Sequence, residues 1–190
     1  IYRILVNWNE LKAYFLVAQP ASTQAARYKA RLLLDMLNDT ITYLYFHFVS
    51  PLVTEFDRVN AFFQATDADP EEMYTELSSH YKSLCARVFD PEGKPLPIEK
   101  VDFGGKFLFE ATKYASSAQH DKAAAQAKVL KVKKRCLDFL LEAVCQVEKR
   151  LPAAHNIFKE LSALHPSKVL NARTRVPFSQ LPLPHLQQEN

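Results

Sequence analysis

Apolar residues recur at steps of three and four along most of the chain, which is the period of an amphipathic helix. The first such pattern covers residues 1–18, and a second, after Pro20, covers residues 25–37. A third runs from about residue 40 to residue 63, with Asp39 as a capping residue. Because Pro51 falls inside the third pattern, we expect a kink or a break near Phe48.

The second half of the chain begins with a strong helix-start signal at Asp69-Pro70, followed by two acids. This signal predicts a helix from about Pro70 to Phe89. Residues 90–106 are rich in proline and glycine, which favours an extended connection with one short strand at Leu96–Val101.

A long helix is predicted from about His120 to Leu151, with Asp121 near its start and Pro152 just beyond its end. Its predicted buried stripe consists of leucine and valine residues, namely Leu130, Leu137, Leu141, Val144 and Leu151. A short helix is expected at 154–164, and the prolines after it favour an extended tail.

Together these patterns predict a mainly α fold, a bundle of about five to seven helices. We divide the chain into a helical domain, residues 1–166, and an extended tail, residues 167–190. The chain has 190 residues, of which 48% are hydrophobic and 24% are charged, values that are typical of globular proteins. No uncharged apolar run reaches about 18 residues, so we expect no membrane span.

The composition argues against several kinds of active site. Only three glycines are present, all within residues 93–105, so neither a P-loop nor a dinucleotide-binding glycine motif exists. No two of the six histidines have the spacing that would place them on one helical face as zinc ligands. We therefore expect no metal and no cofactor in this chain.

The remaining candidates for chemistry have simpler structural explanations. The three cysteines are Cys85, Cys136 and Cys145, and their places in apolar helical patterns favour buried, reduced thiols. The paired acids Asp67/Asp69 and Glu71/Glu72 are explained by helix capping and the helix dipole.

Charge is distributed unevenly, although the net charge is only +3. Residues 1–119 contain 12 basic and 15 acidic residues, whereas residues 120–175 contain 12 basic and 5 acidic ones. Five cations lie within eight residues of the long helix: Lys128, Lys131, Lys133, Lys134 and Arg135. Helical spacing puts Lys128, Lys131 and Arg135 on one face. A basic stripe is typical of phosphate binding, but it is also typical of a solvated helix face or of a site for anionic proteins.

Several stretches, taken in order, resemble one family. They are helical segments that together span nearly the whole chain: Arg3–Leu5, Trp8–Phe15, Tyr43-Leu44, Ser50–Leu52, Val59–Gln64, Leu77 with Tyr81–Leu84, Lys149–Pro152, Phe158–Leu161 and His165-Pro166. This spaced pattern is similar to hAT-superfamily DNA transposases, and more narrowly to transposase-derived zinc-finger (BED-type) proteins of animals. Within that family the chain resembles the helical insertion of the ribonuclease-H-like domain.

The resemblance implies a nuclear protein whose full-length form cuts and pastes DNA with three metal-binding acids, using a divalent metal such as Mg²⁺. Two of those acids would precede Ile1 and the third would follow the insertion, and we do not assign Glu189 to that role. The family's Arg-Trp motif would also lie upstream. We therefore predict that Trp8 is a core residue and not a DNA-contacting one.

The leading hypothesis is a helical fragment of a hAT-transposase-like protein that assists DNA binding and has no nuclease activity alone. Lys128, Lys131, Lys133, Lys134 and Arg135 would contact the phosphates. The alternative is a domesticated module for protein interaction or oligomerisation that does not bind DNA. The basic residues would also be explained if they faced the ribonuclease-H-like body.

Overall fold

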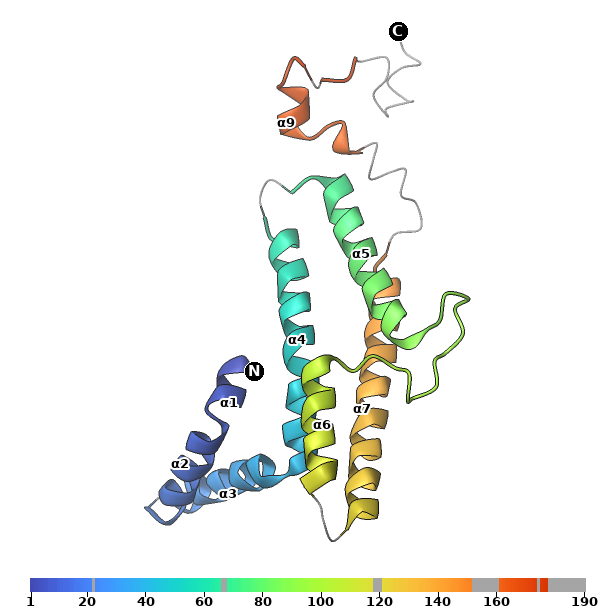
Figure 1. Cartoon of the computed structure of the whole chain (residues 1–190). Coiled ribbons are helices and arrows are strands. Elements are labelled where there is room, and N and C mark those ends of the chain that lie inside the picture. The colour runs from blue at the N-terminus through green and yellow to red at the C-terminus, as the bar shows by residue number, and fades with distance from the viewer. Residues whose placement is uncertain (22, 66–67, 118–120, 152–160, 174, 178–190) are drawn as a thin grey trace. The chain divides into compact units, whose positions relative to one another are not determined.

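The fold is mainly helical, as the sequence pattern predicts. A computed structural model describes residues 1–21, 23–65, 68–117, 121–151, 161–173 and 175–177. Of these residues 76% are helical, in eight named helices, and the described part contains no strand (Figure 1). The count exceeds the expected five to seven because one predicted helix is split and two others, at residues 105–117 and 166–169, were not predicted.

The chain forms two compact units, each assembled from two separate stretches. Unit 1 comprises Ile1–Glu55 and Arg87–Leu141, and unit 2 comprises Phe56–Ala86 and Glu142–Asn190. Each unit therefore joins a segment from the first part of the chain to a segment from the later part. Three helices contribute residues to both units: α4 (Thr40–Phe63), α5 (Pro70–Val88) and α7 (Lys122–Glu148).

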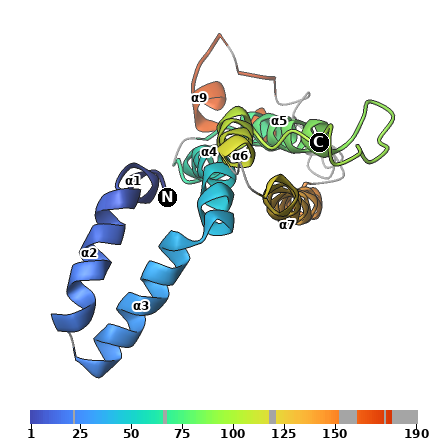
Figure 2. The ribbon, with the colours of Figure 1, turned by 60° about the horizontal axis from the view of Figure 1, so that its bottom comes forward.

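The expected first helix is divided at Asn7 into α1 (Tyr2–Val6) and α2 (Trp8–Ala21). The Asn7 side chain donates a hydrogen bond to the Arg3 carbonyl, which satisfies one acceptor at the end of α1. α2 packs against α3 (Gln24–Asn38), and the two form the helical pair seen in Figures 1 and 2. Trp8 is 5% exposed and is a core residue, as predicted.

Helix α4 (Thr40–Phe63) begins where the sequence indicates but does not break where it was expected to. The Asp39 carboxylate accepts hydrogen bonds from the Ile41 and Thr42 amides, so this predicted cap is confirmed. Pro51 lies inside the helix, and α4 continues through it. Proline removes only one hydrogen bond from the ladder, and the flanking Phe48 and Leu52 are fully buried and anchor the helix on both sides.

Helix α5 (Pro70–Val88) also matches its prediction, since the Asp69 carboxylate accepts a hydrogen bond from the Glu71 amide. The connection that follows contains no strand at Leu96–Val101, so that prediction was wrong. The backbone makes turns there, with Leu96 N–H donating to Val88 and Lys100 N–H donating to Pro97. The prolines leave too few amide donors to extend a ladder beyond one isolated bridge between Phe89 and Pro95.

Helix α6 (Gly105–Ser117) was not predicted. It begins directly after Gly104, whose φ of +87° is the left-handed conformation that glycine adopts readily. Phe107 and Ala111 are buried and four residues apart, so a helical pattern was present. The Gly-Gly pair at the start of this helix is typical of a loop, so the sequence pattern did not predict a helix there.

Helix α7 (Lys122–Glu148) begins directly after Asp121, which was expected near its start and accepts a hydrogen bond from the Ala124 amide. Its predicted buried stripe was wrong in part, because Leu130 and Leu141 are 41% and 38% exposed, whereas Leu137 and Leu151 are half-buried. Val144 is buried as expected. The remaining buried residues of α7 belong to another stripe, formed by Ala125, Val132, Cys136, Leu140 and Val147.

The core of unit 1 is built around the Phe48 ring, which is fully buried. Phe103, Phe107 and Phe139 meet it edge to face, with ring centroids 6.3, 6.4 and 5.8 Å away. This aromatic cluster joins α4, α6 and α7 with the connection before α6, and it holds the unit 1 part of α7 in place.

Unit 2 has a separate core that includes Val59, Leu84 and Val144. The expected helix at 154–164 lies mostly outside the described residues. The predicted tail includes one helical turn, α9 (Pro166–Val169), which an extended tail would not have. The tail from residue 178 onward lies outside the described part.

Candidate nucleic-acid interface

The five predicted phosphate-binding residues all lie on the unit 1 part of α7. Lys128, Lys131, Lys134 and Arg135 are exposed, whereas Lys133 is half-buried. The buried positions Val132, Cys136 and Leu140 define the inner side of this helix. Helical spacing puts Lys131 and Lys134 on the opposite, solvent-facing side and puts Lys133 and Arg135 on its two flanks.

Two of the five cations contact aromatic rings of unit 1. The Arg135 guanidinium lies over the Tyr45 ring, 4.3 Å from its centroid, and the Lys133 ammonium lies 5.8 Å from the centroid of Phe103. Such contacts contribute roughly 0.5–1 kcal/mol at exposed sites. The five residues therefore do not form one continuous stripe: Lys133 is directed to a different flank from Arg135.

These cations are not neutralised by nearby acids. Within the described ranges, no salt bridge joins any of the five side chains to a carboxylate. Lys128 interacts electrostatically with Asp39 at longer range. The pKa of the Asp39 carboxyl is lowered overall. Partial burial acts to raise it, but the hydrogen bonds from Thr42 and Ile41 and the Lys128 charge act in the other direction and have the larger combined effect.

Behind the basic residues, the Cys136 thiol is fully buried. Burial raises the pKa of this thiol to about 12, against the opposing effect of the neighbouring Arg135 charge. At neutral pH the thiol is therefore protonated and is a poor nucleophile. This agrees with the predicted structural role for Cys136.

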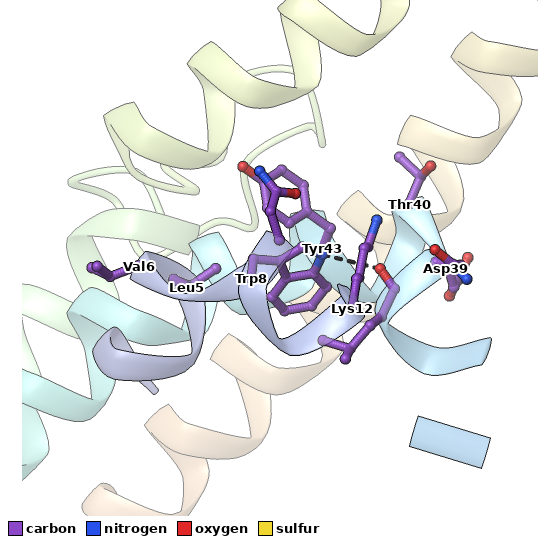
Figure 3. A pocket seen from close by; sticks show the side chains of 10 residues that line it. Leu5, Val6, Trp8, Lys12, Asp39, Thr40 and Tyr43 are labelled. Carbon is purple, nitrogen blue, oxygen red and sulfur yellow. Dashed lines mark hydrogen bonds between the residues drawn. The ribbon is translucent and has the colours of Figure 1, made fainter. Parts of the chain in front are cut away.

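A polar pocket of about 240 Å³ lies beside Trp8, between α1, α2 and the start of α4. Figure 3 shows Lys12 and Asp39 at this pocket, with the Trp8 indole donating a hydrogen bond of 3.0 Å to the Leu37 carbonyl. The Trp8 ring also packs edge to face against Tyr43, at 5.1 Å between centroids. Because Trp8 is held by these contacts and buried, its ring is not available to stack on a base.

A second charged cluster, in unit 2, was not predicted from the sequence. The Asp69 carboxylate accepts hydrogen bonds from the Ser162 hydroxyl at 2.8 Å and from the Lys168 ammonium at 2.7 Å. Lys168 also donates to the Ser162 oxygen. Ser162 is 93 residues from Asp69 in the sequence, so no local pattern announces this contact.

The Ser162–Lys168 pair has the residue types of a serine–lysine catalytic dyad, but its environment does not suit that role. A catalytic lysine accepts a proton from the serine, whereas Lys168 donates to the Ser162 oxygen and forms an ion pair with the Asp69 carboxylate. The Ser162 side chain is 1% exposed, which leaves no room for a substrate. We interpret the cluster as structural, tying α9 to the start of α5.

No three His, Cys, Asp or Glu side chains in the described parts of the chain are grouped closely enough to hold a metal ion. None of the helices described has the length and apolar character needed to span a membrane.

No protein-family model, curated protein or solved structure matches this chain.

Proposed function

We propose that this chain is a helical region of a hAT-transposase-like, DNA-associated protein, and that unit 1 binds the DNA backbone. The observation that carries the proposal is the group of five cations on α7, none of which forms a salt bridge with an acid of the described residues. Lys128, Lys131, Lys134 and Arg135 contact phosphates, and Lys133 extends the positive surface on the other flank.

The proposed binding is electrostatic and does not read base sequence. Cations that neutralise DNA phosphates release condensed counterions, and this release drives association. Tyr45 assists by holding the Arg135 guanidinium in one place, so that less side-chain entropy is lost on binding. The region has no nuclease activity alone in this proposal. Any catalytic acids and Mg²⁺ belong to other parts of a full-length nuclear protein.

A second candidate function, a protein-interaction module, is favoured by a different observation. Unit 1 exposes large apolar side chains on α2 and α3, including Tyr14 at 65%, Val17 at 74% and Tyr28 at 65%. Exposed apolar side chains of this size are common on protein contact surfaces.

Salt-dependent DNA binding separates the two functions. We would measure binding of the chain to duplex and hairpin-ended DNA between 50 and 200 mM salt, which is a range of about fourfold. If all five cations contact phosphates, log affinity falls against log salt with a slope of about 4.5, so affinity drops roughly 500-fold over that range.

The test variant changes Lys128, Lys131, Lys133, Lys134 and Arg135 to Gln. A matched control changes five other exposed cations of unit 1 to Gln: Arg3, Lys29, Arg31, Lys94 and Lys100. Both variants have the same net charge, so only the position of the lost cations differs. We expect the test variant to lose binding and most of the slope, whereas the control retains both. Equal binding by the two variants, or no binding by the unaltered chain, would reject the proposal.

A further inference from the structure

Unit 1 contains an apolar groove that the DNA proposal does not use. The groove has a volume of about 440 Å³ and is formed by α1, α4 and α6. Its apolar wall consists of Tyr2, Leu5 and Val6 from α1 and Phe109 from α6. His47 and Ser50 of α4 line it as well.

Three of the apolar lining residues are open to solvent to an unusual degree. Tyr2 and Phe109 are each 67% exposed, and Val6 is 58% exposed. Leu108, adjacent to Phe109 in α6, is 41% exposed, so the apolar surface continues past the edge of the groove. A small molecule seated in the groove would leave this edge uncovered, whereas a helix of a partner protein would cover both.

The charges around the groove indicate the sign of that partner. Lys106 lines the groove and is exposed. Lys113 is also exposed, and it lies seven residues after Lys106 and four after Phe109, on the same side of α6. The first turn of α6 carries no acidic residue, so the positive end of its dipole adds to the lysine charges. The one acid at the groove, Glu110, is half-buried and acts electrostatically on Tyr43 and His47.

His47 does not add a positive charge to the groove. Burial lowers the pKa of its imidazole, Glu110 opposes that effect, and the Lys106 charge adds to it. Both ring nitrogens are buried and have no hydrogen-bond partner within the described residues. The imidazole in the wall is therefore neutral, Glu110 is half-buried, and Lys106 and Lys113 are exposed, a pattern that matches a ligand with an apolar centre and an acidic rim.

We propose that this groove binds an acidic, amphipathic helix of a partner protein. Its apolar side chains insert between Tyr2, Val6 and Phe109, and its acidic residues face Lys106 and Lys113. The inference does not rest on the DNA-binding proposal, because the two surfaces use different residues. DNA does not fit this groove as well, since a phosphate backbone offers no apolar group to fill it.

The test selects peptides without assuming their sequence. A library of random 14-residue peptides displayed on phage is selected on the whole chain, and the enriched peptides are synthesised and their affinities measured. We expect enriched sequences with Leu or Phe at steps of three and four and with Glu or Asp between them. Phe109→Ser should weaken binding at least about tenfold, as expected for the anchor of an interface.

Charge reversal gives a second and independent readout. The double variant Lys106→Glu/Lys113→Glu should lose the acidic peptides and select basic ones. The matched control is Lys29→Glu/Arg31→Glu on the exposed side of α3, which should keep the original selection. Thermal unfolding establishes that each variant is folded. If Phe109→Ser does not fold, the charge-reversal variant alone tests the proposal.

Three outcomes would overturn the inference: no enrichment, enrichment of neutral or basic peptides, or the same enrichment with Phe109→Ser. Binding of the chain to anionic lipid vesicles but to no peptide would also overturn it, and would assign the groove to a membrane surface. The variant with five Gln on α7 should still bind the acidic peptides. Failure of DNA binding and failure of this inference can therefore be told apart.

Discussion

The cations of α7 in unit 1 and Lys168 in unit 2 are of the same chemical kind, but they have opposite environments. Lys168 lies 2.7 Å from the Asp69 carboxylate and contacts the buried Ser162. Lys131 and Lys134 extend into solvent, and no described acid forms a salt bridge with them. The role of a lysine in this protein therefore depends on whether an acid lies beside it, and not on its place in the sequence. A paired lysine contributes to folding, whereas an unpaired cluster is available to a partner.

The largest effect is expected at Asp69. Asp69→Ala removes the cap of α5 and both contacts to Ser162 and Lys168, and it should lower the free energy of unfolding by about 2–3 kcal/mol. Urea denaturation at pH 7 measures the change. Asp138→Ala, at an exposed position on α7, is the control and should change stability by less than about 0.5 kcal/mol.

The same carboxyl predicts a pH dependence. Burial acts to raise the pKa of Asp69, but hydrogen bonds from Lys168, Ser162 and the Glu71 amide lower it from 3.8 to about 2. Because the unfolded chain holds this proton more tightly, the stabilisation is complete above about pH 4 and is lost as the pH falls toward 2. The shift corresponds to about 2 kcal/mol. A stability profile of Asp69→Ala with the same acid slope as the unaltered chain would contradict this assignment.

A smaller effect should distinguish the two classes of lysine directly. Lys168→Met breaks the contacts to Asp69 and should cost about 1 kcal/mol of stability without changing DNA affinity. Lys134→Met should do the reverse, with stability within about 0.5 kcal/mol and weaker DNA binding. Denaturation and DNA titration of both variants measure the change in stability and the change in DNA affinity for each. Equal stability losses in both variants would remove the contrast.

The smallest effect is expected at Arg135. This residue forms no salt bridge with a described acid, but its guanidinium contacts the Tyr45 ring. A double-mutant cycle of Tyr45→Leu and Arg135→Gln should give a coupling energy of about 0.5–1 kcal/mol in the free energy of unfolding. Lys131→Gln paired with the same Tyr45 change is the control and should show no coupling. A coupling near zero for Arg135 would mean that the ring does not hold the guanidinium.

Much of the fold was predictable because local signals mark it. The caps at Asp39, Asp69 and Asp121 each gave a correct helix start, since capping depends on hydrogen bonds within three residues. The unpredicted α6 lacks such a cap. The residue before this helix is Gly104, which has no side chain to accept a backbone hydrogen bond.

The buried side of α7 could not be chosen from the sequence because this helix has two apolar stripes. Leu130, Leu137 and Leu141 form one, and Val132, Cys136 and Leu140 form the other. Hydrophobicity favours the leucines, but Val132, Cys136 and Leu140 are the residues that are buried, next to Phe139, whose ring meets Phe48 of α4. The contact between Asp69 and Ser162 was hidden for a similar reason, since it joins residues that are remote in sequence.

The fully buried Cys136 has a practical consequence for experiments on this protein. Its protonated thiol is shielded from alkylating reagents while unit 1 stays folded, whereas Cys85 and Cys145 are only half-buried. The rate at which Cys136 is alkylated therefore reports how often the inner side of α7 opens. Cys136 is thus a built-in probe of local opening in the helix that carries the basic cluster.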